Sequence, residues 1–197
     1  PRKSRIAPGR VHGQEAAGAM HLPSPGAAES ALVLVVNCGS SSVKAALIDA
    51  GDGRVLDLQV GDLGPAARLR VGEAVHAAVA ADPAAAVRLV LEAIEARPEL
   101  RGRVAAVGHR AVGHQSGLVL HVAHGGERFV LPAPIDAEVE AAIEALAPLA
   151  PLHNPAALAG IRTARARWPE LVHVAVFDTA FHATLPRRAR EYALPRA

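Results

Sequence analysis

Residues 37–44 (NCGSSSVK) place a glycine, three serines and a lysine directly after an apolar run. A tight turn containing Gly39 and the serines would offer backbone N–H groups and hydroxyls to an anion. Lys44 would add a compact ammonium group, and Asn37 a neutral oxygen of the kind that holds hydrated Mg²⁺. The segment lacks the glycine spacing and the following helix of a P-loop. It therefore predicts either a phosphate-binding hairpin or an ordinary hairpin with a serine-rich tip.

Arg110 ends the tripeptide GHR, directly after another apolar segment. Its planar guanidinium group presents paired donors that match a carboxylate or a phosphate. At the end of a strand it would be well placed to clamp a small acid. The tripeptide alone favours a simpler alternative, an ion pair on the surface.

His153 lies in residues 152–155 (LHNP), just before a predicted helix start. Helix N-termini attract anions through their unpaired N–H groups and the helix dipole. A histidine in that place could steady a phosphoryl group during its transfer. In the structural alternative, Asn154 caps the helix and His153 packs beside it.

Asp178 follows the apolar run His173–Phe177. An acidic side chain at the end of a buried strand is costly unless it has a partner or a task. It could orient a nucleophile, bind a metal ion through water or accept a proton. The structural alternative is a cap on the following loop.

The composition predicts a packed globular protein, because 51% of the residues are hydrophobic. The formal net charge is +2 and the basic residues are scattered, so we expect no nucleic-acid surface. No apolar run reaches the roughly 20 residues of a membrane span. Cys38 is the single cysteine, so no internal disulfide is possible, which favours a reducing, cytoplasmic setting. Its side chain is interpreted as a small residue that fills space. Residues 1–31 are predicted to be a disordered leader.

The elements that must position these residues form an α/β pattern. Three closely spaced strands, predicted at Leu32–Asn37, Val43–Asp49 and Arg54–Val60, suggest an antiparallel meander. Two later strands are predicted at Val104–Val107 and His173–Phe177. Such a mixed sheet gathers its ligands where strands end in loops, which is where the candidate residues lie.

Three helices are predicted between and after these strands. Asp82 is a good N-cap with Pro83 at the first helical position, and apolar residues follow at helical spacing. Asp136 is predicted to cap a second helix, and Asn154 with Pro155 to open a third. The remaining histidines show no metal-ligand spacing and are interpreted as structural or solvated.

In this order the segments resemble the acetate kinase (acetokinase) family, whose opening signature is a strand followed by Asn-x-Gly-Ser-Ser-Ser-x-Lys. Residues 37–44 match that signature. Four later blocks also resemble family segments: residues 107–112, 124–129, 150–155 and 176–182. The likeness runs from about residue 32 to residue 195.

The resemblance implies a ribonuclease H-like fold, shared with sugar kinases, heat-shock ATPases and actin, with two domains around a nucleotide cleft. Residues 32–177 would be the N-terminal domain, and residues 178–197 the start of a truncated second domain. It also implies reversible phosphoryl transfer from ATP to acetate, giving acetyl phosphate and ADP, with Mg²⁺ as cofactor. Family members are cytoplasmic and typically homodimers.

The resemblance also implies a role for each candidate residue. At the phosphate side, Asn37 would help to hold Mg²⁺, and the phosphates would face Gly39, Ser40, Ser42 and Lys44. At the acid side, Arg110 would bind the carboxylate, and Val112 and Leu152 would line the methyl pocket. His153 would stabilise the moving phosphoryl group. Asp178 would be the catalytic acidic residue.

The sequence departs from the family in two places. Residues 113–123 intervene between blocks that nearly adjoin in the family. The family's second half, which supplies the adenosine-binding segments, would follow residue 197. We therefore expect this chain alone to be inactive and to expose apolar surface where that half would dock. The alternatives are a non-catalytic phosphate-binding remnant, a half-enzyme that needs a separate second half, and propionate as the substrate.

Overall fold

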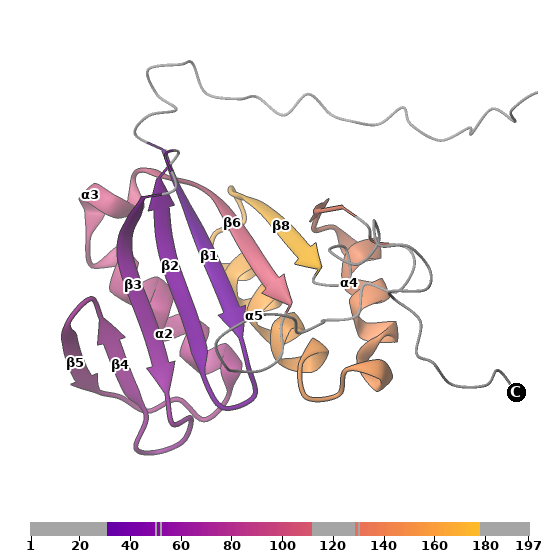
Figure 1. The fold of residues 1–197 in the computed structure, drawn as a ribbon, viewed down its shortest axis with the longest axis horizontal. Coiled ribbons are helices and arrows are strands. Elements are labelled where there is room, and N and C mark those ends of the chain that lie inside the picture. The colour runs from indigo at the N-terminus through magenta and orange to yellow at the C-terminus, as the bar shows by residue number, and fades with distance from the viewer. Residues whose placement is uncertain (1–30, 50, 52, 112–128, 130, 178–197) are drawn as a thin grey trace, which may run out of the picture.

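An eight-stranded mixed sheet, in the order β5-β4-β3-β2-β1-β6-β8-β7, organises the chain (Figure 1). The computed structural model describes residues 31–49, 51, 53–111, 129 and 131–177. The predicted leader (apart from Ala31), the intervening segment 113–123 and residues 178–197 lie outside this part. Within it, the predicted α/β class with a mixed sheet is confirmed.

Five consecutive antiparallel strands form the first half of the sheet. They are β1 (Leu32–Cys38), β2 (Val43–Asp49), β3 (Arg54–Gly61), β4 (Arg68–Val71) and β5 (Ala74–Ala77). The first three confirm the predicted meander, with ends within one residue. The prediction missed β4 and β5, which are only four residues long. Their two-residue loop begins with Gly72 at φ 57°, a hairpin signal that the sequence did contain.

The second half of the sheet is built from strands that are distant in sequence. β6 (Val104–Ala111) pairs parallel with β1, and β8 (Val172–Phe177) pairs parallel with β6. β6 is longer than the predicted strand Val104–Val107, and it includes the backbone of Arg110. The edge strand β7 (Ala133–Pro134) is antiparallel to β8 and was not predicted, because two residues leave no periodic pattern.

The three predicted helices are present as α2 (Pro83–Glu95), α4 (Ala137–Ala145) and α5 (Asn154–Arg167). A short helix, α3 (Pro98–Arg101), follows α2, and the 3₁₀ turn η1 (Ala147–Leu149) lies between α4 and α5. The Asp82 carboxylate accepts from Ala85 N at 2.7 Å, and that of Asp136 accepts from Val139 N at 2.8 Å. Both predicted caps are therefore confirmed. No helix in the described ranges is long and apolar enough to cross a membrane.

The start of α5 differs from the structural alternative that made Asn154 its cap. The N-cap position is His153, which makes no capping bond through its side chain. Asn154 is the first helical residue, and its Nδ2 instead donates to Ile143 O on α4 at 3.2 Å. That carbonyl lies in the last turn of α4, where helix carbonyls lack partners of their own. The capping role was wrong because the amide serves the end of the preceding helix.

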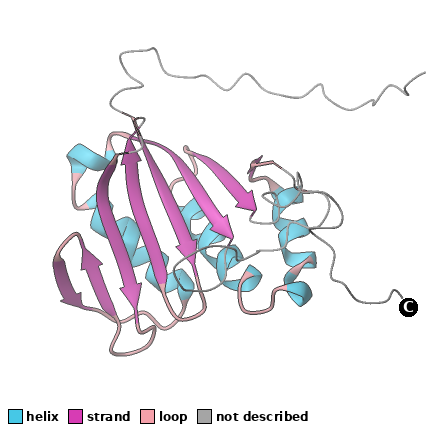
Figure 2. Cartoon of the chain, in the orientation of Figure 1, coloured by secondary structure: helices cyan, strands magenta, loops and turns pink. Residues whose placement is uncertain are grey.

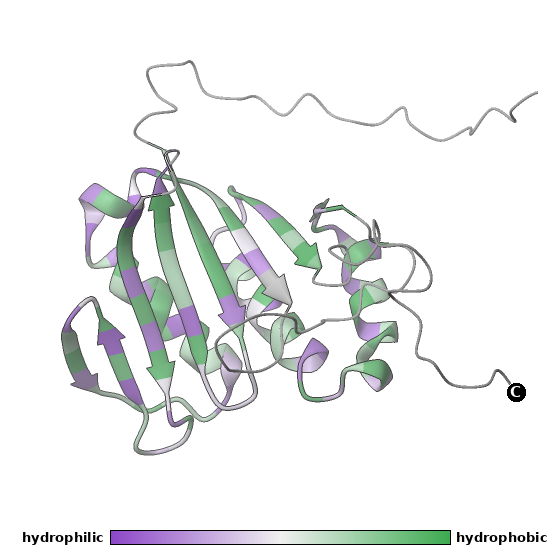
Figure 3. Cartoon of the chain, in the orientation of Figure 1, coloured by the Kyte–Doolittle hydropathy of each residue, from purple (hydrophilic) through white to green (hydrophobic). Residues whose placement is uncertain are grey.

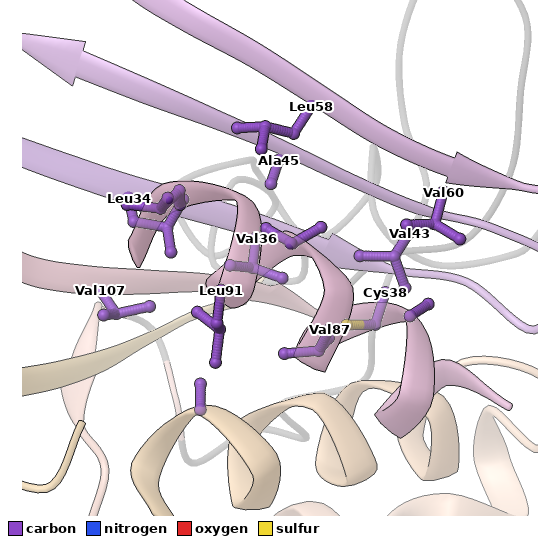
Figure 4. Close-up of a cluster of buried hydrophobic side chains, with 14 of the residues drawn as sticks. Leu34, Val36, Cys38, Val43, Ala45, Leu58, Val60, Val87, Leu91 and Val107 are labelled. Carbon is purple, nitrogen blue, oxygen red and sulfur yellow. The ribbon is translucent and has the colours of Figure 1, made fainter. Parts of the chain in front are cut away.

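The hydrophobic core lies between one face of the sheet and helices α2 and α5, which contact each other and the central strands (Figure 2). Alternate residues of β1 point into it, and Leu34, Val36 and Cys38 are almost fully buried. Figure 4 shows these side chains meeting Val87 and Leu91 of α2. Side chains alternate along a strand, so the remaining residues of β1 face the opposite side of the sheet, away from α2 and α5.

The opposite face of the sheet is covered by none of the described helices, which lie behind or beside the sheet in the view of Figure 3. Val33, Val172 and Val176 are 40%, 43% and 41% exposed. This face therefore exposes apolar side chains, and the docking of a second half on it stays a prediction. Below, this side is called the open face.

Candidate active site

Three of the predicted site residues occupy neighbouring positions on adjacent strands. The register pairs Asn37 of β1 with Lys44 of β2 on one side and with Arg110 of β6 on the other. Neighbouring strands lie about 4.8 Å apart, so the row spans about 10 Å. Asn37 is half-buried on the open face, and Lys44 beside it is exposed. The row joins residues predicted for the phosphate and residues predicted for the acid.

The loop between β1 and β2 is a tight turn held by two backbone hydrogen bonds. Gly39 N donates to Ser42 O at 2.8 Å, and Leu63 N donates to Ser41 O at 3.3 Å. A Cβ atom on Gly39 would lie 3.2 Å from Ser42 O, so a larger residue would require a shift of a few tenths of an ångström in the turn. Ser40 at the tip is exposed, and Ser42 is half-buried. The segment is thus a hairpin whose tip offers hydroxyls to the solvent, as both interpretations of residues 37–44 require.

His153 and Leu152 lie in the connection between α4 and α5. Figure 1 shows this connection at the end of the sheet towards which β1, β6 and β8 point. Asn154 fixes it, since this side chain is 1% exposed and bonded to Ile143 O. His153 is half-buried at the helix start, and Leu152 is 65% exposed. The fold therefore places His153 at the same end of the sheet as Asn37.

Val112 and Asp178 lie outside the described residues. The residues that precede them, Ala111 and Phe177, are register partners at the ends of β6 and β8. Those two strands therefore end side by side, next to the position of Arg110.

A buried histidine pair links β6 to β8 immediately before that position. His173 Nε2 lies 3.0 Å from the carbonyl oxygen of Trp168, which can only accept, so this nitrogen carries a proton. His173 Nδ1 then accepts from His109 Nε2 at 3.0 Å. Burial, aided by the neighbouring His173, lowers the pKa of His109 to about 3. The sequence predicts both to be structural or solvated, and it carries no local signal for a pair that joins positions far apart in the chain.

We expect this pair to make the chain less stable in mild acid. Unfolded histidines titrate near pH 6.5, whereas folded His109 stays neutral down to about pH 3. The unfolded state therefore binds the extra proton, and stability falls as the pH drops below about 6.5. Urea unfolding should show a loss of about 2 kcal/mol from His109 between pH 7 and pH 5.

Two variants separate this effect from other titrations. His109→Gln should remove the His109 share of the loss between pH 7 and pH 5 and leave a smaller loss from His173, whose pKa burial also lowers. The control His76→Gln, at an exposed position on β5, should keep the loss of the parent chain. Arg167 lowers the pKa of Glu95 to about 2, so loss of that ion pair belongs to a lower window, below about pH 4.5. Parallel pH curves for the parent chain and His109→Gln would contradict the assignment.

A groove of about 430 Å³ lies between α2 and α5, away from the candidate site. Exposed arginines line it, but Arg162 is bonded to Glu140 and Glu144, and Arg167 to Glu95. Because two of its three arginines are already paired, and because the groove lies away from the candidate site, we assign it no part in that site. The described residues also contain no group of three or more His, Cys, Asp or Glu side chains that could hold a metal ion.

Comparisons with known proteins identify the family of the chain. Residues 32–197 match the Acetokinase family. The chain is 46% identical over 175 residues to the acetate kinase of Deinococcus deserti, covering 84% of this chain and 40% of that protein. It is 44% identical over 172 residues to the acetate kinase of Shewanella woodyi, covering 83% and 40%.

Two solved structures share the fold. A propionate kinase from Francisella tularensis superposes with a TM-score of 0.70 and 34% identity, covering 84% of this chain and 41% of that one. The acetate kinase of Porphyromonas gingivalis gives a TM-score of 0.70 and 36% identity, covering 84% and 42%. The chain spans about 40% of the length of the curated relatives it matches.

Proposed function

Since the chain belongs to the acetokinase family, we propose that it forms the N-terminal part of an acetate kinase. Such an enzyme transfers a phosphoryl group reversibly from ATP to acetate, giving acetyl phosphate and ADP. The observation that carries the proposal is the row Lys44–Asn37–Arg110 across β2, β1 and β6. In this row Lys44 places a cation on the phosphate side of the Asn37 amide, and Arg110 places one on the acid side.

The phosphate hairpin, residues 37–44, would bind the nucleotide phosphates. The tight turn at Gly39 leaves the hydroxyls of Ser40 and Ser42 near the tip, and Lys44 stands beside them on β2. These neutral donors and one ammonium group fit a phosphate. The Asn37 oxygen suits Mg²⁺, which when bound would neutralise charge on the phosphate oxygens.

The acid would lie on the other side of Asn37. Arg110 would hold its carboxylate, with Val112 and the exposed Leu152 around the methyl group. His153 would donate to the phosphoryl group during transfer, and Asp178 would act as the catalytic acidic residue. Direct transfer requires in-line positioning of the two substrates and neutralisation of the equatorial charge, which these residues would supply.

The domain assignment is part of the same proposal. Residues 32–177 would be the N-terminal domain and residues 178–197 the beginning of the second. Because the chain spans about 40% of its relatives, we infer that it needs the remaining length to bind ATP fully and to dimerise. A cytoplasmic location follows from the same family assignment.

The test is acetyl phosphate formation from ATP, Mg²⁺ and acetate, trapped with hydroxylamine. Two proteins are compared: the 197-residue chain and a chimera that joins residues 32–197 to the remaining part of the Deinococcus deserti enzyme. We expect the chain to be inactive and the chimera to be active. Asp178→Asn in the chimera should lower kcat by about 10²–10⁴-fold.

Each other outcome has a defined meaning. A folded but inactive chimera would overturn the proposed function and favour a non-catalytic remnant. Activity of the chain alone, abolished by Asp178→Asn, would overturn the account of an incomplete site. Activity restored by mixing the chain with a separate second half would identify a half-enzyme.

Propionate is the second candidate substrate, because the solved propionate kinase has the same TM-score, 0.70, as the solved acetate kinase. One additional methylene group in an apolar pocket changes kcat/KM by about 10–200-fold. The ratio of kcat/KM for acetate and propionate in the chimera therefore decides between them.

A further inference from the structure

Helix α5 meets the end of β1 at a point of very close approach, between Gly160 and Cys38. A Cβ atom on Gly160 would lie within 3.0 Å of Cys38 Sγ, an approach that real Cβ atoms essentially never show. Its next neighbours would be Val87 Cγ2 at 3.4 Å and Cys38 Cβ at 3.5 Å. Cys38 is 2% exposed, and its sulfur points between the sheet and the helices, beside Val87 (Figure 4). Glycine at position 160 is what permits this spacing.

Both partners of this contact are directly connected to candidate site residues. Cys38 is the last residue of β1, and it lies between Asn37 and Gly39 in the phosphate hairpin. Gly160 lies in the helix that begins immediately after His153. The six helical steps from Asn154 to Gly160 span about 9 Å at 1.5 Å per residue. The contact therefore ties the hairpin to the element that carries His153.

β1 cannot easily yield at this point, because it is paired with β2 on one side and β6 on the other. The start of α5 is held independently by the bond from Asn154 Nδ2 to Ile143 O. The helix is thus fixed at its first residue and again at Gly160. A methyl group added at Gly160 would meet Cys38 Sγ, so either the Cys38 side chain turns away or α5 tilts from the sheet about its held start, next to His153.

We propose that Cys38 and Gly160 are positioning residues that set the distance between the phosphate hairpin and His153. The role given to His153 rests on the proposed function, whereas the link between hairpin and helix rests on the packing alone. A displacement of about 1 Å at a reacting centre can lower a rate by about 10²-fold. The spacing at this contact therefore matters for phosphoryl transfer more than for substrate affinity.

The first arm of the test uses the thiol of Cys38, the chain's one cysteine, as a reporter in the full 197-residue chain. Burial raises the pKa of this thiol to about 12, so it should react slowly with a disulfide reagent such as DTNB. Gly160→Ala should increase the labelling rate about tenfold or more. Gly61→Ala is the matched control, because its added Cβ would have no heavy atom closer than 3.8 Å. Unchanged labelling in Gly160→Ala would overturn the proposal.

The second arm measures kcat and KM in the chimera. Gly160→Ala should lower kcat about tenfold or more, with KM for ATP changed less than about twofold. Cys38→Ala removes the sulfur that a methyl group at position 160 would meet. The double variant Cys38→Ala/Gly160→Ala therefore has room for that methyl group, and its kcat should lie within about threefold of the kcat of Cys38→Ala. That comparison remains decisive if Gly160→Ala alone does not fold.

The two arms separate the failure of this inference from failure of the proposed function. Faster labelling with unchanged kcat, or no recovery in the double variant, would show that the contact only packs the core. An inactive parent chimera would instead overturn the proposed function and, with it, the positioning role. The labelling arm would still report whether Gly160 fixes α5 to β1.

Discussion

Lys44→Met in the chimera is expected to lower kcat/KM for ATP by about 10²–10³-fold, the cost of removing one preorganised charge from a transferring phosphate. Lys44 stands opposite Asn37 on β2, at the base of the phosphate hairpin. Methionine keeps the length of the side chain and removes the ammonium group. The side chain is exposed, so the free energy of unfolding should change by less than about 0.5 kcal/mol. Hydroxylamine-trapped acetyl phosphate measures the rate, and urea unfolding the stability.

Arg68→Met provides the matched control. Arg68 is another exposed cation of the same sheet, but it lies on β4, two strands from β2. If proximity to the hairpin matters, kcat/KM for ATP should fall less than about twofold in this variant at moderate salt, where distant exposed charges are screened. Equal losses at Lys44 and Arg68 would mean that the surface attracts nucleotide only through its general charge.

Trp168→Ala is expected to lower the free energy of unfolding by about 3–5 kcal/mol, the usual cost of deleting a large buried aromatic side chain. Trp168 is 2% exposed at the end of α5. Its Nε1 donates to Glu95 on α2 at 2.9 Å, and the Arg101 guanidinium lies 4.3 Å from the ring centroid. Its carbonyl also accepts from His173 on β8. One residue therefore joins elements from three parts of the chain.

Circular dichroism should follow this unfolding, because Trp168 is the chain's one tryptophan and the variant loses its fluorescence signal. Trp168→Phe keeps a buried aromatic ring. It should restore more than half of the free energy of unfolding that Trp168→Ala loses. Arg101→Ala removes the contact over the ring, which should cost about 0.5–1 kcal/mol, together with the ion pair to Glu170. A loss below about 1 kcal/mol for Trp168→Ala would show that the side chain is not central to the packing.

Local signals allowed much of this fold to be predicted. Asp82 and Pro83 begin α2 as expected, and the four apolar residues at helical spacing are buried: Val87, Val90, Leu91 and Ile94. The strands of the meander follow from short apolar runs separated by turn-forming residues. These features depend on residues only a few positions apart, so the sequence displays them directly.

The arrangement of the candidate site depends on pairings that no local pattern specifies. The alignment of Asn37 with Arg110 arises because β1 and β6 pair in parallel across a long separation in the chain. The bond between His109 and His173 has the same origin. Gly160 offered no signal either, since the sulfur that requires it belongs to a strand near the beginning of the chain. The residue types were visible in the sequence, but their distances were not.

The strand order of the sheet also sets the order in which the chain can assemble on the ribosome. Strands β1 to β5 each pair with a neighbour in sequence, so the meander can form as soon as it emerges. β1 acquires β6, and β6 acquires β8, only much later in synthesis. At about 5–20 residues per second, the chain between β5 and the end of β6 takes on the order of a few seconds to synthesise. During that interval one edge of β1 is unpaired, and this edge is where a nascent-chain chaperone would have to act to prevent strand pairing between chains.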